Sequence, residues 1–194
     1  MSTDTLEKCS YRSEDDGWVF DIEDPFTGKL QYSIKRYDAV PLDSPKYLQP
    51  KGTKPYPYFS RLIDWDLVSK DLSKDIIITE GAKKADALNQ QGFTAISLQG
   101  TYGWSHKKKM LKSLLSFVKP GRNIYICFDS DQLENKQVAQ AVLELADEVF
   151  HNKYSNQTLL KRPRFDQFLS KISDISKFIN SRRNVFTVCA IVMY

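Results

Sequence analysis

Short apolar runs alternate with segments of helical spacing between residue 75 and residue 150. The apolar runs are rich in β-branched and aromatic residues, as is typical of buried strands, and they lie at residues 75–80, 93–98 and 123–129. Apolar residues with helical spacing predict helices at residues 82–92, 107–118 and 135–150. Strands joined by crossover helices form a parallel sheet that is covered on both faces. The pattern therefore predicts an α/β domain.

Two of the predicted helices have a clear apolar side. In residues 107–118 this side consists of Met110, Leu111, Leu114, Leu115 and Val118. In residues 135–150 it consists of Val138, Ala141, Val142, Leu145, Ala146 and Val149, the strongest helical period in the chain. The helix at 82–92 is expected to end at Gly92.

A different pattern precedes residue 75. Residues 17–38 form two alternating segments around the turn-forming sequence DPFTGK, which predicts a β-hairpin. Residues 40–59 contain five prolines and no helical period, but their aromatic residues would anchor an ordered, extended subdomain. The predicted divisions are a flexible N-terminus at 1–16, a β-rich and proline-rich subdomain at 17–70, the α/β domain at 71–150, and a basic, divergent or truncated C-terminal segment at 151–194.

The composition predicts the cellular location of the protein and argues against a disulfide framework or a zinc site. Hydrophobic residues make up 41% of the 194 residues, which is compatible with a packed core. No window approaches the ~20 apolar residues of a membrane span, and the polar start lacks the layout of a signal peptide. We therefore expect a cytoplasmic protein without a membrane partner. The three cysteines are widely spaced and lack a CxxC pair, so neither a disulfide framework nor a zinc site is expected.

The basic residues are unevenly distributed. The chain has a net charge of +4, but residues 151–194 carry +6 and residues 1–150 carry −2. A basic segment of this kind could contact the phosphates of a nucleic acid, or it could simply be a solvated surface.

Acidic residues follow two of the predicted strands. Glu80 ends the strand at 75–80, Asp129 ends the strand at 123–129, and Asp131 follows two residues later. Ligands of open parallel sheets bind at the carboxyl ends of the strands, and two carboxylates two residues apart can converge on one Mg²⁺. Glu80 could instead only cap the next helix, and Asp-Ser-Asp is a common turn sequence. Their occurrence at equivalent strand ends favours a functional role.

Three segments with these acids resemble the Toprim domain of DnaG-type primases, topoisomerases and certain nucleases. The segments are ITEGAKKADAL, AISLQGTYGW and IYICFDSDQLENKQVAQAVLELADE, and the upstream KYLQPKGTKPYPYF also resembles primase-like proteins. The sequences of these segments are most similar to a Toprim-like family of phages, plasmids and mobile elements. The resemblance covers residues 17–150. It implies a Toprim-type, Rossmann-like parallel sheet flanked by helices, with a small N-terminal β-rich subdomain.

The resemblance also implies roles for the acids. Glu80 matches the glutamate that is proposed as general acid or base, and Asp129 and Asp131 match the aspartates that bind Mg²⁺. The three acids together are the expected metal site, with Mn²⁺ as an alternative ion. Gly81 would allow a tight turn beside the metal, where a Cβ would obstruct it.

Basic residues and glycines near these acids are candidate phosphate-binding or nucleic-acid-binding residues. Lys83 and Lys84 lie in the first turn of a predicted helix, where phosphate can bind. The loop after the second strand would shape a nucleotide or DNA path through Gly100 and Gly103. Its aromatic residues would stack on bases or pack in the core, and these are Tyr102 and Trp104. Further basic candidates are Lys107 and Lys108, which could also be a solvated helix start.

The expected function is primase-like nucleotidyl transfer in the DNA replication of a mobile element. Expected partners are single-stranded DNA or another nucleic acid, nucleoside triphosphates, and a replicative helicase on another chain. Two alternatives stay open: a metal-dependent Toprim-type nuclease, and a catalytically weak accessory module that binds nucleic acid. Residues 151–194 depart from the resemblance, because they lack the further acidic motif that usually follows in Toprim proteins.

The sequence fits two other classes poorly, namely haloacid-dehalogenase-type phosphatases and dinucleotide-binding proteins. In haloacid-dehalogenase-type phosphatases the Asp-x-Asp pair follows the first core strand, whereas here two strand–helix units precede it and Leu133 stands where Thr or Val is usual. The chain also has no GxGxxG or Walker glycine loop, which disfavours dinucleotide binding.

Overall fold

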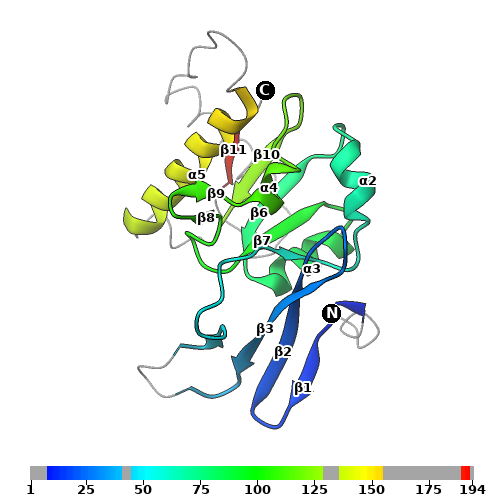
Figure 1. The fold of residues 1–194 in the computed structure, drawn as a ribbon, viewed down its shortest axis with the longest axis vertical. Helices are drawn as coiled ribbons and strands as arrows, with labels where there is room; N and C mark the ends of the chain where they lie inside the picture. Colours follow the sequence, from blue (N-terminus) through cyan, green and yellow to red (C-terminus); the bar gives the residue numbers. More distant parts are fainter. Residues whose placement is uncertain (1–7, 41–44, 129–135, 155–188, 193–194) are drawn as a thin grey trace.

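The computed structural model describes residues 8–40, 45–128, 136–154 and 189–192, and these residues form two main sheets with helices (Figure 1). The first sheet is antiparallel, and its strands follow the chain order. They are β1 (Arg12–Glu14), β2 (Gly17–Glu23), β3 (Leu30–Tyr37) and β4 (Tyr47–Leu48). This sheet is the small N-terminal β-rich region that the sequence predicts.

The second sheet has the strand order β11-β10-β6-β7-β5. Its strands are β5 (Tyr58–Phe59), β6 (Ile76–Glu80), β7 (Ala95–Leu98), β10 (Ile124–Cys127) and β11 (Cys189–Val192). The three central strands are parallel, as predicted, whereas β5 and β11 pair antiparallel with their neighbours. The two edge strands were not predicted as members of this sheet. At one edge, β5 comes from the proline-rich segment that precedes the strand–helix pattern.

Helices cover both faces of this sheet. They are α2 (Trp65–Lys70), α3 (Ala82–Gln90), α4 (Lys112–Leu115) and α5 (Lys136–Tyr154). The small side chains Ala82 and Ala85 of α3 share a buried cluster with Phe20 and Ile34 of the N-terminal sheet, so α3 lies between the two sheets (Figure 1). This α/β arrangement confirms the predicted fold class.

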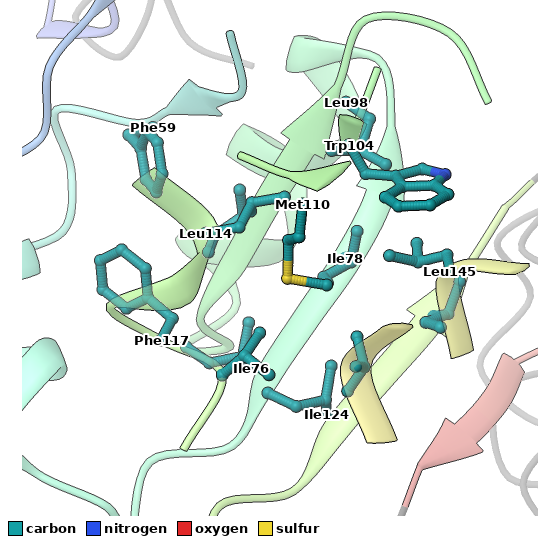
Figure 2. Packing of buried hydrophobic residues seen from close by; sticks show 14 of the residues in the cluster. Phe59, Ile76, Ile78, Leu98, Trp104, Met110, Leu114, Phe117, Ile124 and Leu145 are labelled. Carbon is teal, nitrogen blue, oxygen red and sulfur yellow. The ribbon is translucent and has the colours of Figure 1, made fainter. Parts of the chain in front are cut away.

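The opposite face of the second sheet is the main apolar core. Ile76, Ile78, Leu98 and Ile124 point from the strands toward side chains of the covering segments (Figure 2). Those partners include Met110, Leu114, Phe117 and Leu145. Burial of each such side chain contributes about 1.5–3 kcal/mol, which makes this cluster the main support of the strands that carry the candidate site.

The predicted helix at 107–118 is wrong over its first half. Residues 105–106 and 109–110 form a short antiparallel hairpin, β8 (Ser105–His106) and β9 (Lys109–Met110), and only residues 112–115 are helical. Lys107 and Lys108 form its turn with φ angles of 51° and 61°, as a two-residue turn requires. The side chains at 110, 114 and 118 are buried, although they belong to a hairpin and the short helical segment after it. Their spacing of four residues is the same as that of a continuous helix, and this is why the sequence predicted one.

The N-terminal hairpin was predicted correctly. The carboxylate of Asp24 accepts hydrogen bonds from the backbone N–H groups of Phe26 and Thr27 in the β2–β3 turn. Before β2, residues 12–14 pair with β2 and the side chain of Tyr11 is buried. The ring of Tyr11 packs against Phe20, with ring centroids 5.5 Å apart.

Two further findings concern expectations from composition. Cys127 is disulfide-bonded, which the wide spacing of the three cysteines did not predict. Among the helices of the described residues, none has the length and apolar character needed to cross a bilayer.

Candidate functional site

The candidate site lies at the carboxyl ends of β6, β7 and β10. These neighbouring strands are parallel, and their register pairs Glu80 with Leu98 and Thr79 with Cys127. They therefore end at one rim of the sheet, where Glu80 is the last, half-buried residue of β6. Glu80 lies on the same face as Ile78, because side chains alternate along a strand.

The aspartates expected at this rim lie outside the described residues. Cys127 is the last residue of β10, so Asp129 and Asp131 follow shortly after the strand in the sequence. The described part of the chain contains no group of three acidic, histidine or cysteine side chains that could hold a metal ion. The three-acid metal site thus stays a prediction. Its fit to Mg²⁺ rests on the chemistry of its hard carboxylate oxygens and on the position of Glu80.

Gly81 forms the turn from β6 into α3. Its φ is +89°, a value that L side chains rarely adopt, and its N–H donates to the carbonyl of Leu98 at 3.3 Å. A Cβ on Gly81 would meet no heavy atom within 4 Å. The backbone conformation alone therefore requires a glycine at this turn, and the predicted closeness of Gly81 to a metal stays a prediction.

Lys83 lies beside a small hollow between α3 and the N-terminal sheet. We call it the Lys83 hollow, and its lining consists of Tyr11, Trp18, Phe20, Arg36, Tyr47, Ala82 and Lys83. The Lys83 ammonium lies 5.1 Å from the centroid of the Trp18 ring, within the range of a cation–π interaction. Partial burial, and then the positive charges of Arg36 and Lys46, lower the pKa of Lys83. The hollow thus combines aromatic surfaces with two cations, Arg36 and Lys83.

Trp18, Arg36 and Tyr47 were missed by the sequence analysis. They form a row across three strands, because the register pairs Trp18 of β2 with Arg36 of β3, and Arg36 with Tyr47 of β4. The hairpin signal could have paired β2 with β3, since the turn fixes their register. The sequence could not have predicted that Tyr47 of β4 continues this row, because β4 has only two residues and lies in a proline-rich segment.

The loop after β7 forms another part of the rim. Gly100 has a φ of +82°, and the N–H of Gly103 donates to its carbonyl at 2.9 Å. A Cβ on Gly103 would lie 2.8 Å from the carbonyl oxygen of Gln99, so this tight turn needs a glycine. Trp104 is buried in the main core, whereas Tyr102 is exposed. Of the two aromatic residues, Tyr102 is the one with a surface free for stacking.

The remaining basic candidates occupy different places. Lys84 is half-buried in the first turn of α3, next to Lys83. Lys107 and Lys108 are exposed in the turn of the β8–β9 hairpin, which pairs with neither of the main sheets. The structure thus places Glu80, Gly81 and both α3 lysines in one continuous turn.

A known family matches the part of the chain that carries this rim. It is described as Domain of unknown function (DUF3854), and it matches residues 64–164. The chain belongs to this family. The DUF3854 segment includes β6, α3, β7, β10 and α5, as well as the positions of Asp129 and Asp131, and it leaves out the N-terminal sheet. No curated protein matches the DUF3854 chain.

Several solved primase structures are similar to this DUF3854 protein. The zinc-binding and RNA polymerase domains of the Aquifex aeolicus primase match 91% of this chain with 17% identity and a TM-score of 0.48. A DNA primase domain from Pseudomonas aeruginosa matches 76% with 15% identity and a TM-score of 0.37. The E. coli primase catalytic core matches 89% with 17% identity and a TM-score of 0.37.

The chain is shorter than these structures. It spans 45% of the Aquifex chain, 61% of the Pseudomonas chain and 70% of the E. coli chain.

Proposed function

We propose that this protein is a Mg²⁺-dependent Toprim-type enzyme that acts on phosphodiester bonds, through primase-like nucleotidyl transfer in the DNA replication of a mobile element. One observation carries the proposal: β6 and β10 are adjacent parallel strands, so the strand that ends in Glu80 and the strand that leads to Asp129 and Asp131 approach the same rim. The sequence resemblance to Toprim domains supports the same reading of these acids.

The proposed roles follow from the chemistry of the side chains. Asp129 and Asp131 would hold Mg²⁺, which when bound supplies positive charge to neutralise the phosphate. Glu80 would orient and deprotonate the attacking hydroxyl, because it lies on the neighbouring strand end and is half-buried. Lys83 and Lys84 would attract the phosphates of the substrate at the start of α3.

The Lys83 hollow supports a single-stranded nucleic acid as the partner. Such partners bind through phosphate contacts with cations and through stacking of bases on aromatic rings. Beside this hollow, Lys83 and Arg36, which also pairs with Asp38 at 3.1 Å, would supply the charges, and Trp18 and Tyr47 would supply the rings. The N-terminal sheet would therefore guide the template or primer toward the rim. Nucleoside triphosphates and a helicase on another chain are the further partners of this proposal.

The test is nucleotide incorporation on single-stranded DNA with Mg²⁺ or Mn²⁺. Wild type is compared with Glu80→Gln and with the double variant Asp129→Asn, Asp131→Asn. Asp147→Asn is the matched control, because Asp147 is an exposed acid in the middle of α5. We expect incorporation by wild type and by the control, and loss of incorporation in the other two variants.

Other outcomes contradict the proposal in different ways. Full activity of the double aspartate variant would refute the assigned metal site. Metal-dependent degradation of the template without incorporation would identify a nuclease, in which water replaces the attacking hydroxyl. DNA binding without either reaction, and without dependence on metal or the acids, would identify an accessory module.

A further inference from the structure

Asp86 is a completely buried carboxylate in the middle of α3. It lies one turn after Ala82 and Lys83, on the side of α3 that faces the N-terminal sheet. Its oxygens accept hydrogen bonds from the hydroxyl of Tyr11 at 2.9 Å and from the hydroxyl of Tyr58 at 2.9 and 3.1 Å. The carboxylate thus joins α3 to two other segments of the chain.

The surroundings of Asp86 disfavour its charge but supply several hydrogen-bond donors. Burial raises the pKa of Asp86, while hydrogen bonds from Ser60, Tyr11, Tyr58 and Cys9 act in the opposite direction. A fully apolar interface would avoid this desolvation, so a buried polar group here favours one arrangement of the partners over others. The network therefore specifies how the N-terminal segment lies against α3.

The network is directly connected to the Lys83 hollow. Tyr11 donates its hydroxyl to Asp86, and its ring lines the hollow. Phe20 also lines the hollow and packs between Tyr11 and Tyr58, with ring centroids 5.5 and 5.9 Å apart. The inner wall of the hollow is thus held by the groups that surround Asp86, whereas its outer cation and ring are Lys83 and Trp18.

We propose that Asp86 is a positioning residue. By holding Tyr11 against α3, it sets the position of the N-terminal sheet relative to Lys83, and with it the affinity of the surface around the Lys83 hollow for single-stranded nucleic acid. The choice of ligand rests on the proposed function, whereas the positioning of Tyr11 and Trp18 does not. Asp86 itself does not contact the ligand in this proposal.

The experiment compares two variants of the network with a matched control. Asp86→Asn replaces the carboxylate, and Tyr11→Phe removes one donor while it keeps the ring. Tyr32→Phe is the control, because Tyr32 is buried in the same cluster but its hydroxyl bonds to the backbone of Tyr56. All proteins are used as the full chain.

Two readouts separate positioning from general stability. The first is the ¹⁹F NMR spectrum of protein labelled with 5-fluorotryptophan, in which Trp18→Phe assigns one of the resonances of the three tryptophans. The second is the affinity for a labelled single-stranded oligothymidylate, measured below the unfolding temperature of every variant. We expect Asp86→Asn and Tyr11→Phe to shift the Trp18 resonance and to weaken binding several-fold, and Tyr32→Phe to change neither.

Contrary results have distinct meanings. An unshifted Trp18 resonance in both network variants would overturn the positioning role. A shifted resonance with unchanged affinity would overturn the link between the hollow and the ligand. Absence of oligonucleotide binding by wild type would refute the proposed function and the choice of ligand, and the resonance would then decide the positioning role alone.

Discussion

Lys153 provides a test of the packing at the C-terminal end of α5. Its side chain is only 2% exposed, and its ammonium donates a hydrogen bond to the carbonyl of Arg122 at 2.7 Å. Burial lowers the pKa of Lys153 from 10.5 to about 8. Lys153→Met keeps an apolar chain of similar length and removes the titrating group.

The sign of the pH effect follows from the two states of the protein. The unfolded chain holds the Lys153 proton up to about pH 10.5, whereas the folded chain releases it near pH 8. Between these values the unfolded state binds more protons, so the free energy of unfolding rises with pH. At about 1.4 kcal/mol per pKa unit, the complete rise attributable to Lys153 is about 3 kcal/mol.

The assay is urea unfolding of wild type and Lys153→Met at several pH values between 7 and about 10.5. We expect the stability of wild type relative to the variant to increase across this range, because titrations shared by both proteins cancel in the difference. The exposed-lysine variant Lys109→Met serves as the control for the loss of a lysine as such. A difference between wild type and Lys153→Met that stays constant with pH would refute the reasoning.

Three further substitutions test the local geometry. Gly81→Ala places a side chain at φ +89° and should reduce stability by about 1–2 kcal/mol, measured by urea unfolding; an unchanged midpoint would contradict the conformation. Asn89→Ala removes the two hydrogen bonds, 3.1 and 2.7 Å long, between its amide and the backbone of Ala95, and should cost about 2 kcal/mol; retention of wild-type stability would show that water replaces them. Arg122→Ala leaves the carbonyl of Val68 without its guanidinium donor and should cost about 3 kcal/mol in thermal unfolding; a loss below about 1 kcal/mol would contradict this role.

The sequence predicted the central strands and the long helix because their patterns have a single physical explanation. Residues 76–80 and 124–127 are buried or half-buried on both faces of the sheet, so they appear as continuous apolar runs. The prediction of a single helix at residues 107–118 was wrong because side chains from two different elements, a hairpin and a short helix, enter the same core. The spacing of apolar residues indicates which residues are buried, but it does not indicate whether the backbone between them is helical.

The candidate site was predictable where a single strand–helix turn forms it. Glu80 and Lys83 lie together because the chain passes directly from β6 into α3. Trp18 and Arg36 meet Lys83 only through the packing of the N-terminal sheet on α3, which no local pattern encodes. Asp86 was equally hidden, because a carboxylate in an amphipathic helix is normally on its solvated side.

The position of α3 between two sheets has a consequence for fragments of this protein. The family match begins at residue 64, but Phe20, Ile34 and Tyr58, which cover Ala82 and Ala85 of α3, all precede that residue. A fragment that starts at residue 64 would expose this apolar surface to water. It would also lose β5, and β7 would become an open edge that can pair with strands of other molecules. The boundary of sequence similarity is therefore not a boundary at which the chain can be cut without promoting self-association.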